Sequence, residues 1–149
     1  MRSTNQDDAQ GNVDQRMRTM FTLWIALFIS IGLYYAFSLV KGRPEGLDPE
    51  STLPLPWIAV ALSTVLISFL IKSKLISQAV DQQRVQLVQQ AYIVAWAITE
   101  TAALVGLLLF FLNGNRFYYV LFLIAAAGML LHFPRREHVL NASSRRSVT

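Results

Sequence analysis

The sequence predicts an all-α fold, an integral membrane bundle of four transmembrane helices. More than half of the 149 residues are hydrophobic (54%), only 15% are charged, and the mean hydropathy is +0.41. The apolar residues gather into four runs, which polar or proline-rich segments separate. Because a soluble domain of this length needs a more polar surface, the composition indicates that lipid surrounds most of the chain.

The four apolar runs have lengths typical of membrane-spanning helices. A helix rises about 1.5 Å per residue, so roughly 20 residues cross the hydrocarbon core of a bilayer. The first run carries no charge from Thr19 through Val40. The second run is short, and we expect Lys72 and Lys74 at its end to extend to the membrane surface. The predicted spans are 20–40, 57–72, 90–112 and 117–133, inside a membrane domain of residues 19–134.

The segments outside the spans are polar. Residues 1–18 lack apolar periodicity and predict a disordered tail, and residues 135–149 predict a second, basic tail. The segment Lys41–Pro56 contains four prolines and two glycines, which predicts a turn-rich loop. Residues 73–90 form a Gln-rich connector, from which we expect the third helix to begin near Asp81.

Two short connections shape the expected packing. Asn113–Gly114 is a tight-turn signal between the third and fourth spans. We expect spans 1 and 2, and likewise spans 3 and 4, to form antiparallel hairpins.

The distribution of basic residues predicts the orientation. Ten Lys and Arg residues fall on the side shared by both tails and the Gln-rich connector, and three fall on the other side. Because basic residues are retained in the cytoplasm, we expect both termini there, in a plasma membrane such as the bacterial inner membrane. The expected anchors to anionic lipid headgroups are Lys72, Lys74, Arg135 and Arg136.

Glu100 lies near the centre of the third run. A charged carboxylate there costs about 2.5–3.5 kcal/mol or more, so it must be protonated or hydrogen-bonded inside the bundle. No Lys or Arg lies at its depth, and the nearest predicted partners are Ser30 and Thr64, beside Thr99 on its own helix. A stripe of small residues next to it predicts a closely packed neighbouring helix: Ala95, Thr99, Ala103 and Gly106.

Two interpretations of Glu100 follow. In the first, the carboxyl is structural and hydrogen-bonds neighbouring helices, and the protein is a non-enzymatic structural or accessory component. It then packs with itself as a homo-oligomer, or with another membrane protein, through the small-residue faces of spans 3 and 4. In the second, Glu100 handles a proton or cation in a membrane subunit. A third hypothesis is an anchor that recruits a cytoplasmic partner through Gln82, Gln83, Gln86, Gln89 and Gln90.

Several function classes are not expected. The sequence has no cysteine, no paired carboxylates, no zinc-protease motif and no Gly-rich phosphate loop, so we expect no enzyme, metal site or cofactor. The basic residues flank apolar runs without interleaved aromatics, so we expect membrane lipids and not nucleic acid as partners. His132 is expected at the membrane interface, far from Glu100.

One segment resembles a known family. The pattern Ala97-x-x-Glu100-x5-Gly106-Leu107 resembles the ion-carrying helix of the proteolipid (c) subunits of rotary ATPases. The resemblance implies a Glu that carries a proton or sodium ion within a ring of hairpins. The second span, however, has no glycine, whereas that family has a glycine-repeat helix before the carboxyl. The layout also resembles small four-span bacterial inner-membrane proteins that have no assigned function.

Overall fold

The protein is a bundle of α-helices. The computed structural model describes residues 2–42 and 53–143, with the side chains of residues 11, 13–42, 53–112 and 114–142. These residues contain no strand, which confirms the predicted all-α class. The helices are α1 (Arg2–Lys41), α2 (Leu55–Asp81), α3 (Val85–Asn113), α4 (Tyr119–Leu131) and α5 (Arg136–Ser143).

Three of these helices, α1, α2 and α3, are long and apolar enough to cross a membrane. The fourth apolar helix, α4, has only 13 residues. At about 1.5 Å per residue it rises about 20 Å, less than the ~30 Å hydrocarbon core. It ends before the predicted boundary because the chain turns at His132 ahead of Pro134, which lies in a non-helical link to α5.

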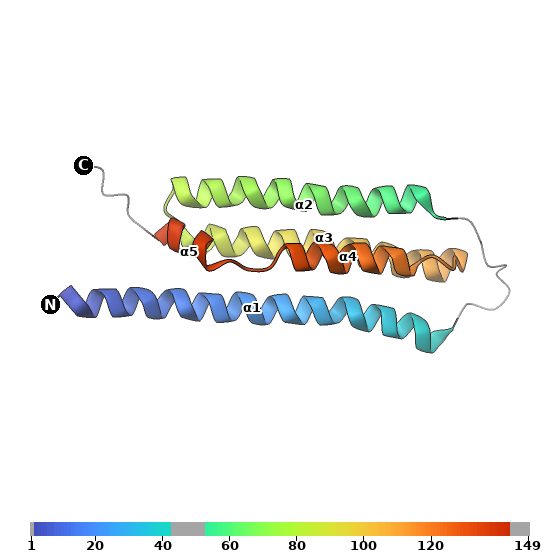
Figure 1. Ribbon diagram of the computed structural model, residues 1–149, viewed down its shortest axis with the longest axis horizontal. Helices are drawn as coiled ribbons and strands as arrows, with labels where there is room; N and C mark the ends of the chain where they lie inside the picture. Colours follow the sequence, from blue (N-terminus) through green and yellow to red (C-terminus); the bar gives the residue numbers. More distant parts are fainter. Residues whose placement is uncertain (1, 43–52, 144–149) are drawn as a thin grey trace.

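The central helix of the bundle is α3. It packs against each of the other four helices, and 44% of its most apolar stretch is buried, against 11% for α1. Figure 1 shows α1 and α2 on opposite sides of α3 and α4. Over the described residues α1 does not contact α2, so the expected hairpin of the first two spans is wrong. The partner of α2 is α3, to which a very short turn joins it.

That turn occupies only Gln82–Arg84. The N–H of Gln83 donates to the carbonyl of Val80, at 3.2 Å, and the N–H of Arg84 to that of Ala79, at 3.0 Å. These two bonds form a Schellman motif, which closes the end of α2. Gln83 takes the left-handed position with φ of 52°. The Gln-rich connector is therefore almost entirely helical. Asp81, the expected start of the third helix, is the last residue of α2, and α3 begins at Val85 after the turn.

Both predicted tails contain helix, which corrects the expectation of disorder. In α1, Val13, Met17 and Met20 continue the packing face of the membrane span into the polar segment. In α5, Val139 and Ala142 are buried. Apolar side chains at helical spacing therefore order segments whose overall composition is polar. Positions 43–52 of the predicted loop, and 144–149 of the basic tail, lie outside the described residues.

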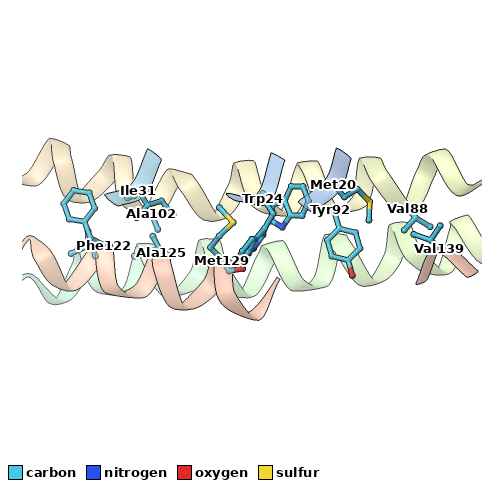
Figure 2. Close-up of a cluster of buried hydrophobic side chains, with 14 of the residues drawn as sticks. Met20, Trp24, Ile31, Val88, Tyr92, Ala102, Phe122, Ala125, Met129 and Val139 are labelled. Carbon is cyan, nitrogen blue, oxygen red and sulfur yellow. Dashed lines mark hydrogen bonds between the residues drawn. The ribbon is translucent and has the colours of Figure 1, made fainter. Parts of the chain in front are cut away.

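The centre of the bundle is filled by a cluster of buried side chains. The residues labelled in Figure 2 belong to α1, α3, α4 and α5, and the cluster also includes Ala61 and Ala79 of α2. Trp24 of α1 reaches α4, where its indole N–H donates to the carbonyl of Met129 at 2.9 Å. The predicted small-residue stripe of α3 packs against α4. A Cβ on Gly106 would lie 3.0 Å from Leu121 Cβ, and one on Gly128 would lie 2.8 Å from Thr99 Cγ2.

Candidate functional site

The side chain of Glu100, on α3, faces α1. Its Oε1 accepts hydrogen bonds from Ser30 Oγ, at 2.6 Å, and from the Tyr34 hydroxyl, at 3.1 Å. Both donors come from α1, on which they are one helical turn apart and share a face. The carboxyl is half-buried. An acceptor in the middle of an apolar helix is thus satisfied by a neighbouring helix, as a membrane interior requires.

The hydrogen positions at Ser30 admit two arrangements. Ser30 Oγ also lies 2.7 Å from the carbonyl oxygen of Leu27, which can only accept. A serine hydroxyl has one hydrogen. With that hydrogen directed at Glu100, the carboxyl is a pure acceptor. With it directed at Leu27, the short contact to Oε1 is a hydrogen bond only if the carboxyl carries a proton and donates it to Ser30.

The other predicted partners of Glu100 lie elsewhere. Thr64 donates to the carbonyl of Ala61 on its own helix, at 2.8 Å. Thr99 faces α2, where its hydroxyl lies 3.3 Å from Ser68 Oγ. The structure therefore brings Ser30 to Glu100 but neither threonine. Sequence reasoning missed Tyr34, although its spacing of four residues from Ser30 places it on the same face of α1.

A second polar cluster joins α2, α3 and the end of α4. His132 is fully buried among the helices. Its Nε2 lies 2.6 Å from Ser68 Oγ, and its carbonyl accepts the indole N–H of Trp96 at 3.0 Å. Nδ1 is buried without a hydrogen-bond partner. Ser68 Oγ lies 2.6 Å from the Val65 carbonyl, so the Nε2–H tautomer satisfies both contacts and leaves only an acceptor unpaired at Nδ1.

A third cluster surrounds Tyr92 of α3, which is fully buried. Its hydroxyl accepts the backbone N–H of Arg135, at 3.1 Å, and lies 2.7 Å from His138 Nδ1. The ammonium of Lys72 lies over its ring, 5.1 Å from the centroid. Burial lowers the pKa of His138 below its usual 6.5, with smaller contributions from the charges of Lys72 and Arg135.

The four predicted headgroup anchors fall into two classes. Lys72 and Arg135 are both held in position by the protein. Lys72 is half-buried, and the backbone N–H of Arg135 is bonded to Tyr92 although the Arg135 side chain is exposed. Lys74 is exposed. Arg136 is also exposed and forms an ion pair with Asp14 of α1, with 2.9 Å between Nη2 and Oδ1. Such surface pairs contribute little stability.

The polar clusters occupy different depths. Eight residues separate Tyr92 from Glu100 on α3, a rise of about 12 Å. Among the residues with described side chains, no group of three metal-ligand side chains lies together.

Comparisons with known proteins add no relative: no protein family, curated protein or solved structure matches this chain. What the side chains can do is therefore inferred from their own geometry.

Proposed function

We propose that this chain is a multi-pass plasma membrane protein, of the bacterial inner-membrane type, with a non-enzymatic structural or accessory role. In this proposal the chain spans the bilayer four times and both termini are cytoplasmic. Three long apolar helices support it, as does the count of basic residues on the two sides. The fourth crossing is made by α4 together with the apolar and aromatic residues that flank it.

The observation that carries the structural role is the hydrogen bonding of Glu100 to Ser30 and Tyr34. Most of α1 is exposed, and in lipid such a surface gains nothing from hydrophobic burial against a neighbouring helix. Its attachment therefore depends on shape and on polar contacts. Glu100 provides two such contacts at mid-depth, so its role in this proposal is to fasten α1 to the other helices.

Association with a second copy or with another membrane protein is part of this proposal, but the surface differs from the one expected. The small-residue faces of α3 and α4 are already packed against each other at Gly106 and Gly128. A partner must therefore use a face that is still exposed. The outer face of α1 qualifies, because Ile29 and Leu33 are 53% and 61% exposed.

A double-mutant cycle tests the fastening role. Unfolding in detergent is measured for Glu100→Leu, for Ser30→Ala and for the double variant. Hydrogen bonds between membrane helices are worth about 0.6 kcal/mol on average and up to about 1.7, and we expect a coupling energy in this range. Thr64→Val is the matched control, because Thr64 bonds only within its own helix, and it should show no coupling to Glu100→Leu. Zero coupling for Ser30 would contradict the proposal.

The second candidate function is proton or cation handling at Glu100. The observation that favours it is the position of Ser30 Oγ, 2.6 Å from Oε1 and 2.7 Å from the Leu27 carbonyl oxygen. With this geometry Ser30 can donate to a carboxylate or accept from a protonated carboxyl. Carbodiimide labelling tests it, because the reagent modifies a protonated carboxyl that lipid can reach. Labelling at Glu100, together with loss of proton flux in Glu100→Gln vesicles, would favour this candidate. Normal flux in Glu100→Gln would end it.

The third candidate is recruitment of a cytoplasmic partner. It is favoured by the exposure of Gln82, Gln83, Gln86 and Gln90 at the α2–α3 turn, with Gln89 half-buried beside them. Co-purification with the intact protein, compared with a Gln82→Ala/Gln86→Ala variant, tests this candidate.

A further inference from the structure

The residues around Tyr92 bring two positively charged side chains, those of Lys72 and Arg135, close to each other. Lys72 of α2 lies over the rings of Tyr92, at 5.1 Å, and Phe69, at 5.3 Å. Arg135, in the link between α4 and α5, is fixed by the hydrogen bond from its backbone N–H to the Tyr92 hydroxyl. One buried side chain of α3 therefore positions basic residues that come from two other parts of the chain.

Among the described side chains, neither Lys72 nor Arg135 forms a salt bridge. Both Lys72 and Arg135 act on His138 and lower its pKa, so all three lie within electrostatic range of one another. The salt bridge found among the described side chains is that of Arg136 with Asp14, and it involves neither residue. Glu137 is the acid next to them on α5, and its effect on His138 is the smallest of the four causes. An added anion would relieve this repulsion.

We propose that Lys72 and Arg135 form a binding site for a phosphate group, supplied in the membrane by the headgroup of an anionic phospholipid. This inference rests on the proposed membrane location. The depth of the site fits it: α2 rises about 26 Å from Leu55 to Lys72, close to the ~30 Å thickness of a hydrocarbon core. The site thus lies where the apolar part of α2 ends, and the non-helical segment after α4 reaches the same level.

This site differs from general attraction between basic residues and an anionic surface. The half-buried stem of Lys72 and its two aromatic contacts fix the position of its ammonium. The guanidinium of Arg135 is exposed and can form two parallel hydrogen bonds to phosphate oxygens. Lys74, two residues further along α2, is exposed and has no such contacts, so it provides a matched control of equal charge.

Lipid retention by the full-length chain tests the proposal. The protein is purified in neutral detergent, and native mass spectrometry measures bound phosphatidylglycerol and bound phosphatidylcholine. We expect the wild type to retain phosphatidylglycerol in preference. Lys72→Gln should weaken this retention about tenfold, the loss of one charge-assisted hydrogen bond, and Arg135→Gln should weaken it at least as much. Lys74→Gln should leave it unchanged. An equal loss in Lys72→Gln and Lys74→Gln would overturn the proposal.

Two further arms complete the test. Inorganic phosphate is added at millimolar concentration, and if it displaces phosphatidylglycerol in the wild type and binds with the same dependence on Lys72, the lipid source is overturned. Lys72→Arg keeps the charge and should keep most of the retention, whereas loss in this variant with unchanged helix content contradicts a role for the charge. Carbonate extraction separates the two proposals. Wild type that stays in the membrane without lipid preference overturns only the site, whereas wild type that is extracted overturns the membrane location.

Discussion

Gly128 lies where α4 closely approaches both α2 and α3. A Cβ there would lie 2.8 Å from Thr99 Cγ2 and 3.0 Å from Val65 Cγ2, on α3 and α2 respectively. Both of these atoms belong to β-branched side chains with little freedom to turn aside. Small residues allow membrane helices to pack at such distances, and Gly128 therefore sets how α4 sits against α2 and α3.

We expect Gly128→Ala to lower the free energy of unfolding by about 1–3 kcal/mol, because the added methyl group overpacks the contact. Gly32→Ala is the matched control, because a Cβ at Gly32 meets no atom within 4 Å. It should be neutral or raise stability by up to about 1 kcal/mol through helix propensity. Denaturation by sodium dodecyl sulfate in mixed micelles measures both. Equal effects of the two substitutions would show that the close approach does not exist.

His138 makes the packing of α5 dependent on pH. Burial lowers the pKa of His138 in the folded protein, and the positive charges of Lys72 and Arg135 lower it further. The negative charge of Glu137 opposes this with a smaller effect. Protonation is therefore more favourable when α5 is detached. The stabilising contribution is complete above the unfolded pKa of 6.5 and is lost progressively as the pH falls below it. Protonation also places a hydrogen on Nδ1, so that across 2.7 Å the Tyr92 hydroxyl is then the acceptor.

Hydrogen exchange checks this dependence. Amides of α5 should open more easily at pH 5 than at pH 7.5 after correction for intrinsic exchange rates, while amides of α3 change less. In His138→Gln the difference between the two pH values should shrink. An unchanged opening free energy of α5 in the wild type would contradict the assignment.

For single residues, the sequence predicted which side chain needs a polar partner. It did not predict which partner faces that side chain, because this depends on how each helix is rotated about its axis. Glu100 was singled out because a carboxyl inside an apolar run needs a partner, and Ser30 is such a partner. Thr64 was proposed from its depth alone, yet depth does not fix which side of a helix a residue faces. Tyr34 was missed because its hydrogen bond to Glu100 depends on how α1 is rotated against α3, and the burial of His132 against Ser68 depends on how α4 packs on α2.

Among the elements, the α2–α3 turn contains a local conflict between sequence and geometry. Gln83 has φ of 52°, a conformation in which an L side chain costs roughly 1–2 kcal/mol and glycine costs nothing. The Schellman hydrogen bonds at Val80 and Ala79 hold it there. A glycine is the usual residue at this position.

Gln83→Gly should therefore raise stability by up to about 1 kcal/mol, a gain reduced by the greater freedom of glycine in the unfolded chain. The control is Gln78→Gly, at an exposed position inside α2, which should lower stability by about 1 kcal/mol. Both are measured by thermal unfolding in detergent. Destabilisation by Gln83→Gly as large as that by Gln78→Gly would mean that the turn is not left-handed at this position.

The elements themselves were largely predictable. Apolar length identified α1, α2 and α3, and Gly114 takes the left-handed conformation that the Asn113–Gly114 signal predicts, with φ of 59°. The ordered parts of both tails were missed because average polarity was weighed above spacing. Val13 and Val139 each belong to a short apolar face, and such a face becomes helical only against a surface formed elsewhere in the chain.

In the whole molecule, α1 begins at the same end of the bundle as α5 (Figure 1), as two termini on one side of a membrane require.

The absence of cysteine makes any introduced thiol unique. We expect Gln15→Cys and Gln82→Cys to resist a membrane-impermeant maleimide in intact cells and to react after lysis. Arg116→Cys, at the opposite end of α3, should react in intact cells. Labelling of Gln15→Cys from outside would reverse the orientation.

The order of the helices around α3 could not be obtained from connection lengths. The short loop between the first two spans suggests that they pair, but α1 pairs with α3 and α4 instead. The choice depends on which faces are complementary, and those faces are built from residues far apart in sequence. The contact of Ser30 with Glu100, for example, spans 70 residues.

That separation has a consequence for biosynthesis. At about 5–20 residues per second, Glu100 leaves the ribosome roughly 4–14 s after Ser30. In the proposed membrane arrangement, α1 therefore enters the bilayer before the helix that holds it has been made. Ser30 can meanwhile donate to the carbonyl of Leu27, at 2.7 Å on its own helix. The Ser30 hydroxyl, which later bonds Glu100, thus has a hydrogen-bond partner on its own helix until α3 has been synthesised.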